Sequence, residues 1–271
     1  MSRIAATFAK LRAARRTALI PFITAGDPTP AVTLPAMHAL AAAGADILEL
    51  GVPFSDPMAE GPVIQAACER ALAHGVSLRD VLAMVREFRA ANATTPVVLM
   101  GYLNPIEAMG YQAFAEALAE AGVDGVITVD SPPDEAQDLS QALLAHGVDP
   151  VYLVAPTSTP ARMRMIAEAG RGFIYYVSMK GVTGASHLAV SSVVAKLTEL
   201  RAYTDLPIGV GFGIQDGAAA AALAAAADAV IVGSVLVKRF AALQQTPEAI
   251  PADIAALVAD LRAVIDGGAP R

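Results

Sequence analysis

The chain has 271 residues, of which 55% are hydrophobic and 17% charged, so it can bury a large core and is too apolar to be intrinsically disordered. Its net charge of −7 at pH 7 disfavours nucleic-acid binding, because an acidic surface repels phosphate backbones. The single cysteine, Cys68, excludes a disulfide framework and favours a cytoplasmic location, and no apolar run is long enough to span a membrane.

The first predicted element is a helix at residues 3–14, which lacks the continuous apolar segment of a signal peptide. Eight short apolar runs follow it, and they are rich in valine and isoleucine without polar alternation. Such runs are typical of parallel strands that are buried on both faces. The runs are Ala18–Thr24, 47–50, 97–100, 126–129, 151–154, 173–177, Ile208–Gly211 and Ala229–Val232.

A motif of glycine, a small residue and aspartate recurs immediately before these runs. It occurs at residues 44–46, 122–124 and 147–149, and a degenerate copy ends at Asp228. Glycine after a helix takes the left-handed conformation that ends the helix, so each copy marks the passage from a helix to a strand. Stretches with helical spacing separate the runs. Eight such units in one chain of this length predict an α/β fold, a single (β/α)8 TIM barrel spanning residues 1–271.

Three segments depart from a plain barrel. An extra N-terminal helix at residues 3–14 precedes the first strand, residues 51–61 form an extended loop after the second strand, and residues 178–187 form another after the sixth. Long loops at the carboxyl ends of barrel strands commonly carry catalytic residues and lids. We therefore expect the functional site at this end of the barrel.

Glu49 lies within the second apolar run, near its carboxyl end. A carboxylate in a buried strand is costly to ionise, so we expect a raised pKa, which suits a general acid or base near neutral pH. The alternative is a glutamate that is held by a structural partner, and the residues alone leave both open. Glu60, in the loop that follows, would on its own be interpreted as a solvated surface side chain.

Glycine-rich turns follow the seventh and eighth runs, at residues 209–213 and at Gly233 with Ser234. Barrels often bind phosphate with these two loops, because glycine lets backbone amides approach the phosphate oxygens. The alternative is a pair of tight turns that need the φ angles of glycine.

Three aromatic residues lie at or just past predicted strand ends: Phe22, Tyr102 and Tyr175. They could surround a flat aromatic ligand, or they could pack in the core. The four histidines and the single cysteine show no metal-ligand spacing, so we expect no metal site. The sequence contains neither a P-loop nor a dinucleotide-binding fingerprint in the required context.

One long segment decides among these alternatives. Residues 48–62 read LELGVPFSDPMAEGP and closely resemble the signature of the tryptophan synthase α-subunit family. The resemblance covers nearly the whole chain in the family's order, with matches at residues 21–28, 102–105, 181–184, 211–213 and 233–234. It implies a barrel lyase of tryptophan biosynthesis that cleaves indole-3-glycerol phosphate to indole and glyceraldehyde 3-phosphate by a retro-aldol step, without a cofactor.

The resemblance also implies roles for single residues. Glu49 matches the family's catalytic glutamate, which protonates the indole ring. Glu60 stands where the family has an aspartate that binds the indole N–H, and its side chain is one methylene longer, so either the loop has shifted or the activity is reduced. The other matches are indole-contacting positions (Phe22, Met100, Tyr102, Tyr175, Phe212), a lid threonine (Thr183) and phosphate-binding positions (Gly184, Gly213, Gly233, Ser234).

The family works as a heterotetramer of two α and two β subunits, in which the β subunit holds pyridoxal phosphate and joins indole to serine. The resemblance therefore implies a β-subunit partner, and it places Asp56, Pro57 and Asn104 at the interface. Two other hypotheses remain: a stand-alone lyase that releases free indole, and a protein that activates the β subunit with little chemistry of its own. The signature argues strongly against a different phosphate-binding barrel.

Overall fold

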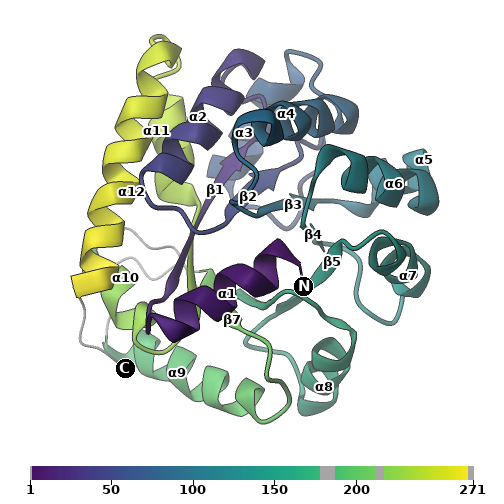
Figure 1. Cartoon of the computed structure of the whole chain (residues 1–271), viewed down its shortest axis with the longest axis vertical. Helices are drawn as coiled ribbons and strands as arrows, with labels where there is room; N and C mark the ends of the chain where they lie inside the picture. Colours follow the sequence, from purple (N-terminus) through teal and green to yellow (C-terminus); the bar gives the residue numbers. More distant parts are fainter. Residues whose placement is uncertain (1, 178–186, 212–216, 268–271) are drawn as a thin grey trace.

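In the computed structural model, which describes residues 2–177, 187–211 and 217–267, eight parallel strands pair in sequence order and β8 closes onto β1 (Figure 1). The strands are β1 (Ala18–Thr24), β2 (Leu48–Gly51), β3 (Val97–Gly101), β4 (Gly125–Thr128), β5 (Asp149–Val154), β6 (Ile174–Val177), β7 (Ile208–Gly211) and β8 (Ala229–Val232). The predicted barrel is confirmed, and each strand boundary lies within two residues of the predicted one.

Helices surround the barrel, and local signals fix their ends (Figure 1). Ser77 and Asp80 form a capping box at the start of α4, and Gly122, with a φ angle of 78°, ends α6. The helices are α1 (Arg3–Ala13), α2 (Pro30–Ala42), α3 (Pro62–Leu72), α4 (Leu78–Ala91), α5 (Leu103–Met109), α6 (Tyr111–Ala121), α7 (Gln137–Ala145), α8 (Pro160–Ala169), α9 (His187–Arg201), α10 (Gly217–Ala224), α11 (Ser234–Ala242), η1 (Pro247–Ala249) and α12 (Ile250–Gly267). None of the helices in the described ranges is long and apolar enough to cross a membrane.

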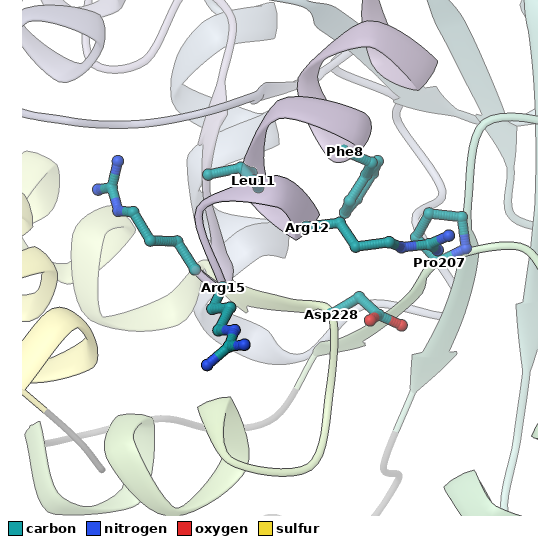
Figure 2. A pocket seen from close by; sticks show the side chains of 7 residues that line it. Phe8, Leu11, Arg12, Arg15, Pro207 and Asp228 are labelled. Carbon is teal, nitrogen blue, oxygen red and sulfur yellow. The ribbon is translucent and has the colours of Figure 1, made fainter. Parts of the chain in front are cut away.

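The predicted extra helix, α1, closes the N-terminal end of the barrel. Its buried residues Ile4, Phe8 and Leu11 pack in one cluster with inward-facing strand residues, and the Phe8 and Phe173 rings lie 5.9 Å apart. A cavity of about 210 Å³ lies beside this helix, and Figure 2 shows Arg12 and Asp228 at it. No residue predicted for the functional site lines this cavity.

The repeated aspartate has a structural role that the sequence analysis did not recognise. At three places, the aspartate just before an even-numbered strand accepts a hydrogen bond from a backbone N–H at the start of the preceding odd-numbered strand. The donor–acceptor pairs are Leu19 N to Asp46 Oδ2 (2.9 Å), Val97 N to Asp124 Oδ2 (2.8 Å) and Ile208 N to Asp228 Oδ2 (2.9 Å). Each bond fastens two neighbouring strands at the N-terminal end of the barrel.

The β5–β6 pair shows why the fourth such bond is missing. Arg171 stands before β6, and its backbone N–H donates to Pro150 O at 2.9 Å, as Asp46 N–H donates to Leu19 O. Because proline has no N–H, an aspartate at position 171 would have no donor to bind. The aspartate of the remaining motif copy, Asp149, accepts instead from Ser2 Oγ at 2.7 Å and so anchors α1.

The extended loop after β2 is confirmed, because β2 ends at Gly51 and α3 begins at Pro62. The other predicted extended loop, after β6, falls almost entirely on residues 178–186, which lie outside the described residues. The loops that follow β1, β2, β3 and β8 lie within the described residues.

Candidate active site

Glu49 is buried on the inner face of β2 and is only 1% exposed. Ile47, two residues earlier, belongs to the cluster inside the barrel, and alternate residues of a strand share a face. No described residue forms a hydrogen bond to Glu49 Oε2. Burial, followed by repulsion from Glu60, raises the pKa of Glu49 to about 8. The expectation of a raised pKa is confirmed, and the side chain is protonated at neutral pH.

The loop after β2 holds Glu60 close enough to act on Glu49. Burial raises the pKa of Glu60, whose side chain is half-buried. The loop is fixed through its backbone, since Ala59 N–H donates to the Tyr102 hydroxyl at 3.0 Å and Gln65 Nε2 donates to the Glu60 carbonyl at 2.7 Å. The residue on its own suggested a freely solvated side chain. The structure shows instead that Glu60 is half-buried.

Tyr175, on β6, lies near both acids. Burial and then repulsion from Glu49 and Glu60 raise the pKa of its hydroxyl well above the ordinary value. A side chain at Gly211, on the neighbouring strand β7, would come within 2.2 Å of the Tyr175 ring. At Gly51, on β2, a Cβ atom would lie 2.7 Å from the Phe22 ring. Glycine at these two strand ends therefore makes room for aromatic rings.

The other predicted indole-contacting residues lie at the same end of the barrel. Phe22 is opposite Glu49 in the β1–β2 register and is buried with Ala67 and Val237, and Met100 packs against this cluster. Tyr102 precedes α5 and is 5% exposed. Its ring stacks on the Phe54 ring at 5.0 Å, in addition to its bond with the loop backbone.

The predicted phosphate-binding residues Gly233 and Ser234 stand where β8 gives way to α11. Ser234 is the first residue of that helix and its side chain is exposed. The first N–H groups of a helix have no partner within the helix, and together with the helix dipole they attract anions. Four other predicted residues lie outside the described residues: Thr183, Gly184, Phe212 and Gly213.

The residues predicted for a partner interface differ in exposure. Asp56 and Asn104 are exposed, whereas Pro57 is buried within the chain itself. Met58, the next residue along this loop, is 85% exposed. The surface of this loop is therefore formed by its polar residues and one large apolar side chain.

Two features at this end were missed by the sequence analysis. Asp27, which is 1% exposed, pairs with Arg70 through two hydrogen bonds of 2.6 and 2.9 Å and so connects the loop after β1 to α3. Thr24 ends β1 with a buried hydroxyl that has no hydrogen-bond partner in the described part of the chain. Its sequence signal was only a hydroxyl residue at the carboxyl end of a buried run. Among the residues described, no group of three or more His, Cys, Asp or Glu could hold a metal ion.

Comparison with known proteins points to one family. A sequence model of the family described as tryptophan synthase alpha chain matches residues 8–266. The chain is 62% identical over 266 residues to the tryptophan synthase alpha chain of Thioalkalivibrio sulfidiphilus, covering 98% of this chain and 100% of that protein. Against that of Chromobacterium violaceum it is 62% identical over 265 residues, with the same coverage.

Solved structures agree with the sequence relatives. The tryptophan synthase subunit alpha of Legionella pneumophila matches with a TM-score of 0.91 at 46% identity, over 98% of this chain and 99% of that one. A tryptophan synthase from M. tuberculosis, in an open form, matches with a TM-score of 0.86 at 40% identity, over 98% and 99% of the two chains. The similarity therefore extends over the barrel as a whole.

Proposed function

The chain belongs to the tryptophan synthase alpha chain family, and from this premise we propose that Glu49 and Glu60 carry out its chemistry. The reaction is the cleavage of indole-3-glycerol phosphate to indole and glyceraldehyde 3-phosphate, and the indole passes to the β subunit for tryptophan synthesis. The α chain needs no cofactor of its own, and pyridoxal phosphate belongs to the β subunit.

Glu49 acts first as an acid and then as a base. Its protonated carboxyl transfers the proton to C3 of the indole ring, which leaves a carboxylate and a positive charge at the ring nitrogen. The carboxylate then removes the proton from the hydroxyl on the carbon attached to C3. As the aldehyde forms, the C3–carbon bond breaks, its electron pair returns to the ring, and Glu49 is protonated again. A pKa of about 8 suits both steps near neutral pH.

Glu60 stabilises the charge that develops between these steps. A carboxylate that accepts the hydrogen bond of the indole N–H favours the positively charged ring over the neutral one. Its repulsion of Glu49 in the absence of substrate fits an anionic group at this position. The backbone that carries Glu60 is held by Tyr102 and Gln65.

The remaining residues bind the two ends of the substrate. Phe22, Met100, Tyr102 and Tyr175 surround the indole, and the start of α11 at Gly233 and Ser234 binds the phosphate. The other predicted positions keep the roles that the family resemblance gives them: Thr183, Gly184, Phe212 and Gly213.

The chain works in a complex with the β subunit of tryptophan synthase. We propose that exposed Asp56 and Asn104 contact this partner together with exposed Met58, and that Pro57 shapes the loop from within. We also propose a single domain over residues 1–271 and, because Cys68 is a free thiol, a cytoplasmic location.

One observation carries the assignment: an acid buried on the inner face of the barrel has a raised pKa, a second acid acts on it, and no described residue bonds to its Oε2. The test is the pH dependence of kcat/KM for indole release by the complex with the β subunit, in the parent and in Glu60→Gln. Cleavage by the parent should fall as the pH rises past about 8, because Glu49 loses its proton. In Glu60→Gln the repulsion is gone, so the fall should come at lower pH.

The matched control is Glu69→Gln, which removes an exposed acid from α3 and should leave the alkaline limb in place. Carbon-13 NMR titration of Glu49 provides the same comparison without turnover. The interaction between these two acids would be refuted if Glu60→Gln and the parent showed the same alkaline limb and the same titration of Glu49.

A further inference from the structure

Thr24 has a buried hydroxyl that forms no hydrogen bond with the residues that the structure describes. It is the last residue of β1 and is 2% exposed. Leaving a buried hydroxyl unpaired costs about 1–3 kcal/mol, and most buried polar groups in folded proteins have a partner. A hydroxyl in this state at the catalytic end of a barrel indicates a group that arrives with the substrate.

The alternation of β1 places this hydroxyl on the inner face. Ala18 and Ile20 belong to the cluster inside the barrel, whereas Leu19 and Ile23 belong to the cluster between the strands and the helices. Thr24 has the same parity as Ala18 and Ile20. Its register partner on β2 is Gly51, whose missing side chain leaves room for the Phe22 ring.

Glu49 stands one inward position before Gly51 on the same strand, and its Oε2 is also buried and unpartnered. Two unpaired oxygen atoms therefore lie on the inner faces of adjacent strands, at the same end of the barrel. A single ligand that carries hydroxyl groups would satisfy both.

The strand order also places Thr24 between two parts of the proposed site. β1 pairs with β2, which carries Glu49, and with β8, which leads to Gly233 and Ser234. In the substrate, the carbon that bears the indole ring and the carbon that bears the phosphate are joined by one carbon with a hydroxyl group. A residue on β1 thus lies where this central carbon must pass.

We propose that the Thr24 hydroxyl binds the central hydroxyl of the substrate's glycerol chain. The inference rests on the proposed function, because it takes Glu49 and the start of α11 as the two fixed ends. The bond orients the chain so that the neighbouring hydroxyl faces Glu49. Thr24 is then a substrate-binding residue that distinguishes a glycerol chain from one without the central hydroxyl.

The test combines protein variants with a change of ligand. Thr24→Val removes the hydroxyl and keeps the shape of the side chain, and Thr24→Ser keeps the hydroxyl. The ligands are glycerol 3-phosphate and 3-hydroxypropyl phosphate, which lacks only the central hydroxyl. Dissociation constants are measured by calorimetry on the full chain.

The parent and Thr24→Ser should bind glycerol 3-phosphate roughly 2- to 12-fold more tightly than the deoxy ligand, as expected for one hydrogen bond. In Thr24→Val this ratio should fall to about one, and kcat/KM for indole-3-glycerol phosphate should fall by a similar factor. Thr17→Val is the matched control, because it removes a buried hydroxyl that bonds to Ala224 O at the other end of the barrel. It should leave the ratio unchanged.

An unchanged ratio in Thr24→Val, or a parent that does not distinguish the two ligands, overturns the inference. A general loss of folding would weaken the binding of both ligands by the same factor, so it would lower both affinities without changing their ratio. If Glu49→Gln cleaves as fast as the parent, the proposed function of the acid fails, whatever the ratio shows for Thr24.

Discussion

At the N-terminal end of the barrel, the buried or half-buried carboxylates of Asp46, Asp124 and Asp228 each accept a backbone N–H and pair with an arginine. At the C-terminal end, Glu49 is buried as deeply, and among the described residues it has no arginine partner and its Oε2 has no hydrogen bond. Two kinds of buried acid in one scaffold thus have opposite surroundings. The first kind fastens strands to each other, and the second keeps a proton that can be transferred.

The difference follows from the cost of burying charge. A buried carboxylate remains ionised only if neighbouring groups compensate for lost hydration. Arg89 compensates Asp124 at 2.6 Å and Arg262 compensates Asp46 at 3.0 Å. Without such a partner Glu49 takes up a proton instead, and this gives a general acid at neutral pH. The same burial therefore gives either a structural bond or a reactive group, and the presence of an arginine decides which.

The strongest test of this contrast is Glu49→Gln. Glutamine cannot transfer the proton, so indole release should fall by roughly 10²- to 10⁴-fold, the usual contribution of general acid–base catalysis. The substrate should still bind, and thermal unfolding should shift little or upward, because a neutral amide replaces a group that is costly to ionise. Turnover within a few-fold of the parent, measured as indole release with the β subunit, would contradict the role of Glu49.

The converse test is Asp124→Ala at the opposite end. It removes the bond to Val97 N and leaves Arg89 without its carboxylate, so the free energy of unfolding should fall by about 3–5 kcal/mol. The rate of cleavage by the folded protein should stay near that of the parent. Urea unfolding measures the loss, and Asp134→Ala is the control, because its exposed pair with Arg162 is worth about 1 kcal/mol or less. A loss below that of the control would show that these bonds do not fasten the barrel.

A smaller effect is expected in the pH dependence of stability. The pKa of Glu49 is about 8 in the folded chain against 4.5 ordinarily, so between these values the folded chain binds more protons than the unfolded one. The free energy of unfolding should therefore fall as the pH rises, by up to about 1.4 kcal/mol per pH unit from this group, and level off above pH 8. Relative to the parent, Glu49→Gln should gain stability progressively between pH 5 and 8. A constant difference across that range would mean that Glu49 does not hold its proton.

The contrast between the two ends also shows what the sequence could reveal. The strands and Glu49 were predictable because an uninterrupted apolar run and a single acid within it are local patterns. The motif that ends at Asp46 was visible, but its partners Leu19 and Arg262 come from distant parts of the chain. Whether a buried acid is paired therefore depends on three-dimensional contacts that spacing does not encode.

Thr24 and Pro57 show the same limit at the catalytic end. Whether the Thr24 hydroxyl has a partner depends on which groups surround it in three dimensions, and the burial of Pro57 depends on how its loop folds back. Neither property has a signature in the neighbouring residues. The family resemblance covered Thr24 in the match at residues 21–28 but gave it no role, and it gave Pro57 a role without its burial.

The smallest expected effect is that of Glu60→Asp, which restores the aspartate that the family resemblance leads one to expect. The loop is held by the Tyr102 hydroxyl on Ala59 N–H and by Gln65 on the Glu60 carbonyl, and both bonds use the backbone. Shortening the side chain therefore leaves these bonds in place and moves only the carboxylate. We expect indole release to stay within a few-fold of the parent or to rise, and the alkaline limb of the pH profile to move slightly to lower pH as the charge retreats from Glu49. The measurement is kcat/KM against pH in the complex, with Glu60→Gln as the variant that keeps the length and loses the charge. A complete loss of activity in Glu60→Asp, with Glu60→Gln less affected, would mean that the length of this side chain matters rather than its charge. The carboxylate of Glu60 would then hold structure, as the aspartates at the N-terminal end do.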